Sequence, residues 1–387
     1  MSATLERIED FKVISSESAF GELRDGWDDL VRAMPRPSPF LLHGWLHEWL
    51  RHYGGDSELA VQAAFRDGRL VGAFPLFRKS WRGLRVARFL GGAHPSLADL
   101  LLAPGEDGSV GAALLERASS EHDFAELFGL AGQSRAAAIA GPGQLQLFER
   151  AVAPVLELTD EWDAIYEAKV SVGRRKDERR RRRRLEERGT VELSLARLPE
   201  EVESALADAF RLHELRWQGR REDTSAFATP GGISFHRDAL SALAARDVVR
   251  LFTLRLDGQA IAFELTFELA GRLYLYRTAF DPAFARYGPG LLVLLDVIAY
   301  ASRERLSRVE FLGGGETYKL ALADRLEPLH LGLGLAATAR GRAVVTTRTG
   351  VLRLRERLKR SPTARRAYDS TRPLRTRLTR AKNDLRT

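Results

Sequence analysis

Apolar residues recur along the chain in helical and alternating patterns that form two similar runs of elements. In the first run the pattern predicts helices at residues 16–33, 41–53 and 110–120, and strands at 59–66, 70–78, 85–90 and 124–130. In the second run it predicts helices at 174–188, 199–218, 234–245 and 291–305, and strands at 191–195, 248–256, 259–269, 272–280 and 308–312. Consecutive strands joined by short turns and flanked by helices predict an α/β (α+β) fold with mixed, largely antiparallel sheets.

The two runs repeat a local pattern. The segments AAFRDGRLVGAFPLF (63–77) and TLRLDGQAIAFELTF (253–267) both place an Asp-Gly turn between similar strands. This repeated pattern favours internal duplication of one fold, although hairpins are common and the repeat alone is a weak signal. We therefore predict an N-terminal unit at 1–160, a C-terminal unit at 161–335 and a basic tail at 336–387.

Positive charge is concentrated in two segments of a chain whose net charge is +8. Residues 174–188 contain 10 Lys+Arg and 4 acids, and residues 340–387 contain 16 Lys+Arg and 3 acids. The remainder carries a net charge of −11. This segregation indicates an anionic partner such as phosphate, nucleic acid or an anionic membrane. The alternative is a solvated helix face and a tail without a partner.

The tail has the pattern of an amphipathic helix. Val351, Leu352, Leu354 and Leu358 lie among arginines at near-helical spacing, which suits an anionic membrane surface. Tyr368 is its one aromatic residue, so base stacking with nucleic acid is the weaker interpretation.

Composition excludes several classes of protein. The chain has no cysteine, which rules out disulfides, thiolate catalysis and Cys-based metal sites. No apolar run approaches the ~18 residues that span a bilayer, and the first residues do not resemble a signal peptide. We expect a cytoplasmic protein, with the tail as a possible peripheral contact to the inner face of the membrane. His47 and His52 lack the spacing of a zinc helix, so no metal site is predicted.

A strand followed by a glycine-rich turn and an apolar helix is the sharpest chemical feature. The stretch from Asp281 to Gly290 would present backbone N–H groups and a helix N-terminus to a phosphate group. Arg286 could add a positive charge on a pyrophosphate. The alternative is an ordinary strand-to-helix loop, and no Gly-Lys-Ser/Thr follows to make it a P-loop.

Several motifs in order resemble the GNAT acyltransferases, and in the second unit most closely the CelD/BcsL-type acetyltransferases associated with cellulose biosynthesis, relatives of the Fem-type peptidyl transferases. The motifs are the arginine-rich helix, His213-x-x-Arg216-Trp217, Phe235-His236, Phe280-Asp281-Pro282, Gly288-Pro289-Gly290, and Phe311-Leu312-Gly313-x-x-Glu316-x-Tyr318-Lys319. The resemblance covers residues 165–335 well and the first unit loosely. Ala285 replaces the usual polar residue of the turn, with Arg286 one position later.

The resemblance implies a tandem GNAT fold that binds acetyl-CoA or another acyl-CoA in its second unit. The N-terminal GNAT-like unit would be degenerate for cofactor binding. The implied cofactor-binding residues are Ala279, Phe280, Arg286, Tyr287, Gly288 and Gly290. The implied catalytic residues are Glu264, Asp281, Tyr318 and Lys319. The implied acceptor-binding residues are Asp99, Arg216, Trp217 and His236.

Alternatives remain open for most of these roles. Glu264, placed among apolar residues, is our first choice for the base, and its alternative is the solvent face of a strand. The alternative role of Asp281 is to cap the turn. His236 is a second candidate base or a structural histidine, and Lys319 a phosphate or acceptor contact or a surface lysine.

The resulting hypothesis is an acyl-CoA-dependent N- or O-acyltransferase. It transfers an acyl group directly to an amine or hydroxyl of a polysaccharide, glycoconjugate or lipid-linked precursor. The first alternative is a Fem-like transferase that uses aminoacyl-tRNA, with the arginine helix and the tail contacting RNA. The second is a non-catalytic scaffold that binds polyanions.

Overall fold

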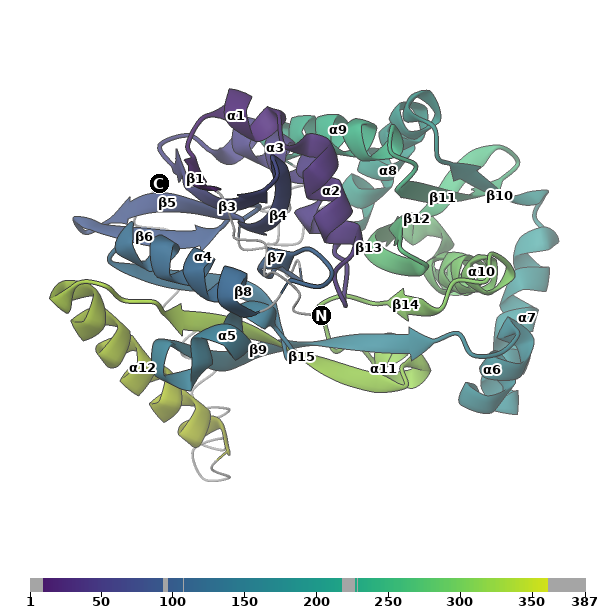
Figure 1. The fold of residues 1–387 in the computed structure, drawn as a ribbon. Helices are drawn as coiled ribbons and strands as arrows, with labels where there is room; N and C mark the ends of the chain where they lie inside the picture. Colours follow the sequence, from purple (N-terminus) through teal and green to yellow (C-terminus); the bar gives the residue numbers. More distant parts are fainter. Residues whose placement is uncertain (1–9, 93–96, 107, 218–226, 228, 361–387) are drawn as a thin grey trace, which may run out of the picture.

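Two α/β units lie side by side in the computed structural model, with the N-terminal unit on the left of Figure 1 and the C-terminal unit on the right. The structure describes residues 10–92, 97–106, 108–217, 227 and 229–360. The N-terminal unit comprises β1 (Asp10–Ile14), α1 (Glu17–Gly21), α2 (Arg24–Arg32), η1 (Pro39–Leu41), α3 (His43–Tyr53), β2 (Glu58–Leu59), β3 (Val61–Arg66), β4 (Arg69–Phe74), β5 (Leu76–Trp81), β6 (Leu84–Phe89), β7 (Leu101–Leu102), α4 (Gly108–Ser120), β8 (Phe124–Ala131), α5 (Arg135–Gln144) and β9 (Leu145–Glu157).

The C-terminal unit is entered through two helices and is followed by one more. It comprises α6 (Trp162–Lys169), α7 (Val172–Glu186), β10 (Val191–Ala196), α8 (Pro199–Trp217), α9 (Pro230–Ala244), β11 (Val249–Leu256), β12 (Gln259–Leu269), β13 (Arg272–Phe280), η2 (Pro282–Tyr287), α10 (Pro289–Arg303), β14 (Arg308–Glu310), α11 (Thr317–Leu322), β15 (Arg325–Gly334) and the final α12 (Ala339–Arg360).

Both units repeat one order of elements, which confirms the mixed α/β fold class. Each has a strand, a helical layer, three antiparallel strands, a helix, a strand, a helix and a last strand. The N-terminal unit adds the short strands β2 and β7 and divides its second antiparallel strand into β4 and β5. In each, the third antiparallel strand pairs in parallel with the strand after the helix, β6 with β8 and β13 with β14. The Asp-Gly turns also match, because Asp67 and Gly68 have φ of 49° and 72° and Asp257 and Gly258 have 48° and 80°. Two successive positive φ angles are typical of a type I′ hairpin turn.

The last strands are exchanged between the units. β9 pairs with β14 of the C-terminal unit, and β15 pairs with β8 of the N-terminal unit, while β9 and β15 lie next to each other. The result is one eleven-stranded sheet of order β10-β11-β12-β13-β14-β9-β15-β8-β6-β5-β2, which runs across both units (Figure 1). A four-stranded sheet of order β1-β3-β4-β7 completes the N-terminal unit. The domain boundary predicted at residue 160 falls between β9 and α6 and stays a prediction.

Two predicted elements are divided in the structure. The strand predicted at 70–78 is interrupted at Pro75, between β4 and β5. Proline has no N–H to donate to a ladder, so the chain leaves the four-stranded sheet there and joins the larger one. The helix predicted at 16–33 is two helices, α1 and α2, separated at Glu22 and Leu23.

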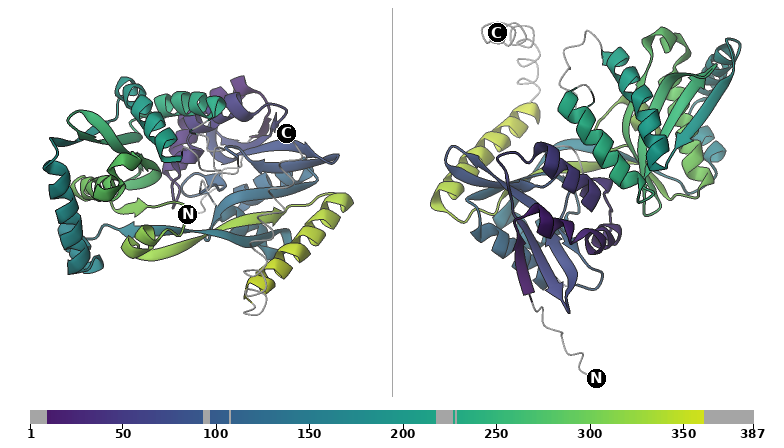
Figure 2. Two further views of the ribbon diagram at one scale, coloured as in Figure 1. Left: turned by 180° about the vertical axis from the view of Figure 1, so that it is seen from behind. Right: turned by 90° about the horizontal axis from the view of Figure 1, so that it is seen from above.

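The helical layers of the two units meet where α3 packs against α9, as the view from above shows (Figure 2). Gly44 allows this approach, since a Cβ on it would lie 3.1 Å from Cβ of Ala242. Trp45 is 1% exposed and packs edge-on against Phe235 of the opposite helix at 4.9 Å. Aromatic burial therefore joins the two units on this side.

The tail begins as predicted, with an arginine-rich helix. The helix α12 extends along the lower left edge of the molecule in Figure 1. The remainder of the predicted tail, from residue 361, lies outside the described residues. Of the helices that the structure describes, none is long and apolar enough to cross a membrane.

Candidate active site

An opening in the large sheet forms the centre of the candidate site. β14 pairs only with the start of β13, from Arg272 to Tyr274. The rest of β13 extends past β14, because the chain turns away after Glu310 and Leu312 adopts φ 57°. A β-bulge at Tyr276 further reshapes β13, since Leu265 faces Arg277 and the next residue of β12 faces Leu275. Bulges of this kind are common next to active sites.

Backbone N–H groups of β13 alternate between the partner strand and the opening. The N–H of Asp281 donates to the carbonyl of Ile261 on β12 at 2.9 Å. In an antiparallel ladder the N–H groups of every second residue of a strand point to the same neighbouring strand. The N–H of Ala279 therefore points to β12, which argues against its predicted role, whereas the N–H of Phe280 points to the opening.

The glycine-rich turn connects β13 to α10. Asp281 Oδ1 accepts a hydrogen bond from the N–H of Ala283 at 2.9 Å, so Asp281 caps η2, as its structural alternative proposed. Its catalytic role stays a prediction. Gly288 has φ 64° and precedes the first residue of α10, Pro289. Pro289 has no N–H, so the N–H of Gly290 is the first donor that α10 can offer to a ligand.

Side chains of other residues lie close to both predicted glycines of the turn. A Cβ on Gly290 would lie 3.0 Å from Cδ1 of Phe280, and a Cβ on Gly288 would lie 2.9 Å from Nη1 of Arg181. Arg181 belongs to α7, which packs on η2. A side chain at either glycine would displace the groups that surround the turn.

The basic residues of the turn region differ in exposure. Arg286 is exposed, and its guanidinium donates to Oη of Tyr287 at 2.6 Å and lies 4.7 Å from the centre of that ring. Tyr287 is buried, at 7% exposure. Tyr287 thus positions Arg286 beside the helix N-terminus, and an anion there would meet Arg286 and Arg181.

A cavity of about 370 Å³ lies between α6, α7, α10 and α11. Its walls include Arg174, Arg181, Leu291, Leu295 and Tyr318. The acids Asp177 and Glu178 also line it, and Asp177 is paired with Arg180 and Arg181. The cavity therefore joins the start of α10 to Tyr318, a predicted catalytic residue on α11.

Glu264 lies on β12 between Phe252 of β11 and Thr278 of β13, and only 3% of it is exposed. The solvent-face alternative is therefore wrong. Burial raises the pKa of Glu264 to about 8, against smaller lowering effects of a hydrogen bond from Thr278 and the charge of Lys319. A carboxylate with this pKa is a stronger base than an ordinary glutamate.

Tyr318 and Lys319 on α11 approach Glu264 in space. The pKa of Tyr318 is raised by burial and then by the negative charges of Glu264 and Glu316. Lys319 Nζ lies 3.0 Å from Glu316 and stabilises the charged form of Glu264. Three predicted catalytic residues from two distant segments are thus brought together, with Tyr318 still 38% exposed.

Two predicted acceptor residues lie beside this site. Arg216, near the end of α8, places its guanidinium 4.4 Å from the centre of the Phe280 ring. Its neighbour Trp217 is part-buried, with Arg216 5.9 Å from its ring. Both residues therefore lie at the end of β13, where the turn begins.

The two other predicted acceptor residues have structural roles. Asp99 is 8% exposed and accepts hydrogen bonds from the backbone N–H groups of Leu100, Arg135 and Ala136 and from the hydroxyl of Ser134, all at 2.7–3.0 Å. It caps α5 in the N-terminal unit, far along the sheet from Glu264. Its carboxylate oxygens are thus used within the N-terminal unit, and its predicted contact with the acceptor stays a prediction.

His236 is 1% exposed and lies in the aromatic contact between α3 and α9. Its Nδ1 is 2.6 Å from the carbonyl of Gly232, and its Nε2 is 2.9 Å from Oη of Tyr276. Nδ1 therefore carries the proton that it donates to Gly232, and Nε2 accepts from Tyr276. These contacts argue against a base and favour the structural alternative.

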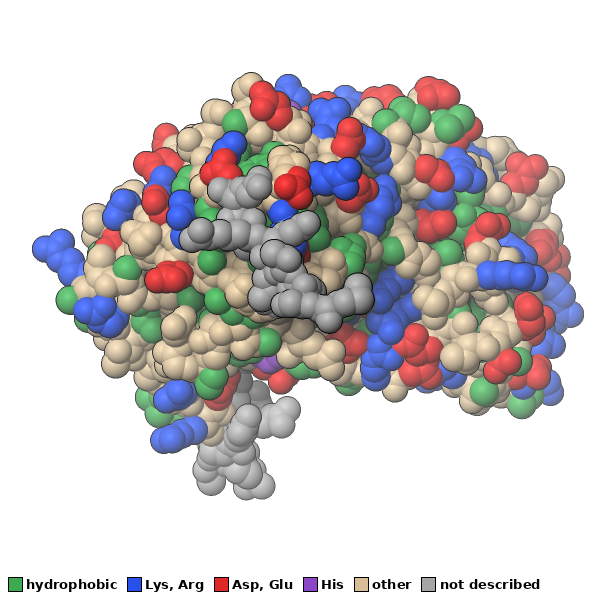
Figure 3. All heavy atoms as spheres, in the orientation of Figure 1, with side chains coloured by type: hydrophobic (Ala, Val, Ile, Leu, Met, Phe, Trp, Pro, Cys, Tyr) green, Lys and Arg blue, Asp and Glu red, His purple; other side chains and the backbone are tan. Residues whose placement is uncertain are grey.

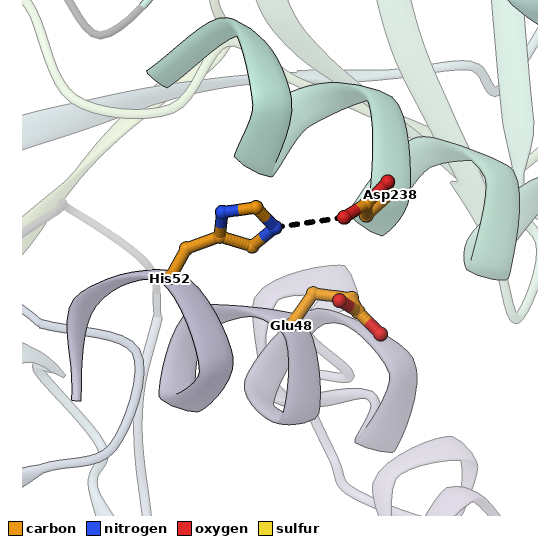
Figure 4. Close-up of side chains that lie close together, drawn as sticks. All are labelled: Glu48, His52 and Asp238. Atoms are coloured by element: carbon orange, nitrogen blue, oxygen red, sulfur yellow. Dashed lines mark hydrogen bonds and ion pairs between the residues drawn. The ribbon is translucent and has the colours of Figure 1, made fainter. Parts of the chain in front are cut away.

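A second group of titratable side chains joins α3 to α9 (Figure 4). Glu48, His52 and Asp238 bring possible ligand atoms within 4.8 Å of one another. His52 Nε2 lies 2.8 Å from Asp238, and Glu48 is paired with Arg51 at 2.7 Å. The contact of His52 with Asp238 joins the two units, and the pair of Glu48 and Arg51 lies within α3. The sequence could not reveal this group, because Asp238 is distant along the chain.

Arg181 and Thr278 are site residues that the sequence analysis missed. Arg181 is one of six consecutive arginines that cover every side of α7, so only the packing of α7 on η2 shows which one reaches the turn. Thr278 follows from strand register, which pairs it with Glu264. A reliable strand alignment would have identified it.

Comparisons with known proteins agree with this arrangement. Residues 173–320 match the family described as "Acetyltransferase (GNAT) domain". A comparison with curated proteins finds no significant relative.

Solved structures show the same fold over most of the chain. A conserved protein of unknown function from Bacteroides thetaiotaomicron has a TM-score of 0.57 and 16% identity, covering 85% of this chain and 100% of that chain. FemX has a TM-score of 0.58 and 11% identity, covering 84% and 97%. The C-terminal domain of a putative lysylphosphatidylglycerol synthetase from Agrobacterium fabrum has a TM-score of 0.52 and 12% identity, covering 86% and 97%.

The matched family spans α7 to α11 and so contains the glycine turn, Glu264 and Tyr318. The strands and helices of that segment hold these residues of the candidate site. Residues 173–320 therefore match a GNAT acetyltransferase domain, and the chain is an acyltransferase.

Proposed function

We propose that the protein transfers an acyl group from acetyl-CoA or another acyl-CoA directly to an amine or hydroxyl. The observation that supports this most is the cavity that joins the start of α10 to Tyr318 and, through it, to Glu264. A phosphate-binding turn beside a buried carboxylate is the arrangement that acyl transfer from a phosphate-bearing donor requires.

In this proposal the donor's pyrophosphate binds at Gly288–Gly290, with Arg181 and Arg286 supplying positive charge. The thioester oxygen accepts a hydrogen bond from the N–H of Phe280 at the open edge of β13. Arg216 and Trp217 would contact the acceptor at the end of that strand.

The chemical step would use the residues around Glu264. Glu264 removes a proton from the acceptor as the acceptor's nitrogen or oxygen attacks the thioester carbon. The C–S bond breaks, and the CoA thiolate takes a proton from Tyr318, whose raised pKa keeps it protonated before the reaction. The proton held by Glu264 then returns to Tyr318, which restores both groups. Lys319 stabilises the negative charge of Glu264. The chain has no cysteine to form a thioester intermediate, which favours direct transfer.

For the acceptor, we propose a polysaccharide, glycoconjugate or lipid-linked precursor. This rests on the resemblance of the motifs to CelD/BcsL-type acetyltransferases, and it would place the protein in cellulose or exopolysaccharide biosynthesis. A cytoplasmic protein, peripheral to the inner face of the membrane, would meet such an acceptor.

A second candidate donor is aminoacyl-tRNA. The position of the basic helix α7 against the turn favours it, because α7 could contact the RNA backbone while the aminoacyl end enters the same cavity. The two proposals can be distinguished by one property. Only the acyl-CoA proposal predicts that the protein binds free acyl-CoA.

The test is a calorimetric titration of acetyl-CoA and longer acyl-CoAs into nucleic-acid-free protein. Gly290→Glu should abolish binding, because it places a side chain against Phe280 and a negative charge at the helix N-terminus. The matched control is Gly108→Glu at the start of α4, where a Cβ would meet nothing within 4 Å. Binding that survives Gly290→Glu would contradict the proposed donor site, and binding of aminoacyl-tRNA without acyl-CoA would favour the second donor.

A further inference from the structure

The final helix α12 carries an apolar face with nothing packed on it in the described part of the chain. Its inner side is anchored, since Val344, Val345 and Leu352 pack against the sheet strands β15 and β8. Arg348 adds an ion pair to the buried Glu126. The helix is therefore fixed on the body by its inner side.

The outer side of α12 also carries apolar residues, but these are exposed. Val351, Leu354 and Leu358 are 45%, 58% and 49% exposed. Their spacing of three and four residues puts them on one face of the helix. Soluble surfaces expose single apolar residues often, but a row of three on one helix face indicates an interaction site.

Arginines flank this apolar row on both sides. At 100° per residue, Arg353 and Arg357 lie on one side of the row and Arg355 on the other, and all three are exposed. Figure 3 shows blue Lys and Arg side chains with green apolar atoms between them along this lower left edge of the molecule. The chain after this helix adds eight Lys or Arg and two Asp, so the positive charge continues.

We infer that the outer face of α12 binds the surface of an anionic lipid membrane. Leucines flanked by arginines fit an interface where acyl chains lie next to anionic headgroups. Nucleic acid would use the arginines but leave the apolar row in water, because the described part of α12 has no aromatic residue to stack on a base. The apolar row therefore favours lipid over RNA.

The orientation of the molecule follows from this contact. α12 lies on the N-terminal unit, at the opposite end of the sheet from α7, as Figure 1 and both views of Figure 2 show. A membrane bound at α12 would thus leave the candidate site in the C-terminal unit uncovered by the contact helix itself.

The experiment is co-sedimentation of the full chain with vesicles of phosphatidylcholine mixed with phosphatidylglycerol, and with vesicles of phosphatidylcholine alone. The double variant Leu354→Glu/Leu358→Glu should lower the partition coefficient for the anionic vesicles at least ~tenfold, since burial of two leucines is lost. Both side chains are exposed, so its thermal unfolding should match that of the wild type.

Leu193→Glu/Leu198→Glu on the C-terminal unit is the matched control, because these leucines are 38% and 49% exposed and the variant adds the same two charges. It should bind as the wild type does. Arg355→Gln/Arg357→Gln should weaken binding and reduce its dependence on salt.

Three results would overturn the inference. The first is vesicle binding that is unchanged in the double leucine variant. The second is equal binding of the wild type to vesicles of phosphatidylcholine alone. The third is binding of a tRNA mixture, without vesicle binding, that depends on Arg355 and Arg357, which would assign the helix to RNA.

Discussion

The N-terminal and C-terminal units share an order of elements but differ at one central position. Seven residues after the aspartate of the matching turn, the N-terminal unit has Phe74 and the C-terminal unit has Glu264. Both side chains are buried, and Phe74 packs edge-on against Phe89 at 5.8 Å. The same place in the fold thus carries an apolar core residue in one unit and a titratable group in the other.

The connection after the third antiparallel strand differs as well. β13 runs through η2 and Gly288 directly into α10, whereas the chain between β6 and α4 passes through β7. In the C-terminal unit the turn before the helix therefore follows the third antiparallel strand directly, whereas in the N-terminal unit the turn before α4, with Gly105 at φ 85°, follows the edge strand β7. The comparison shows that one fold can be used as a scaffold in one unit and as a site in the other, through few residues.

The strongest way to test this contrast is to remove the carboxylate from one unit and change its counterpart in the other. Glu264→Gln should lower kcat about 10²- to 10⁴-fold while donor binding is kept, because the amide cannot accept a proton. Phe74→Leu should leave kcat nearly unchanged. Release of CoA can be followed with a thiol reagent, since the protein has no cysteine of its own.

The pH profile sharpens the same test. Glu264 acts as a base only when deprotonated, and its pKa is raised to about 8. Activity of the wild type should therefore rise with pH up to about 8 and then level off. A profile that levels off near the ordinary pKa of a glutamate would contradict this role.

The buried glutamates of the two units offer a second comparison. Glu310 is fully buried and accepts from Arg36 at 2.6 Å, and Glu126 is 3% exposed and binds Arg88 and Arg348. Arg36→Ala should lower the free energy of unfolding by about 2 kcal/mol, because a buried carboxylate loses its closest partner.

Arg348→Ala should cost less, about 1 kcal/mol or below, because Arg88 remains 2.6 Å from Glu126 and Arg348 is more exposed than Arg36. Chemical denaturation of both variants measures the difference. Equal losses would show that Arg36 has no special role in joining the two units.

The basic helix α7 has arginines that differ in what they face. Arg181→Gln should weaken donor binding about tenfold, because its guanidinium lies at Gly288. Arg183→Gln, on the exposed side of α7, should change binding much less. Equal weakening by both, measured by calorimetry, would indicate only a general effect of charge.

The sequence by itself determined the elements and their duplication. Strand alternation, helical spacing and the two Asp-Gly turns are local signals, because they depend on residues close together in the chain. The glycine turn before α10 was also found this way, since positive φ at Gly288 and the helix start after it are local properties.

The tertiary structure alone decided which residues meet. Glu264 could be read as a solvent-facing residue until the packing of β12 showed that it is buried. Asp99 and His236 carry reactive groups but use them within the fold. The exchange of β9 and β15, and the choice of Arg181 among six arginines, depend on contacts between segments far apart in the chain, which no local pattern records.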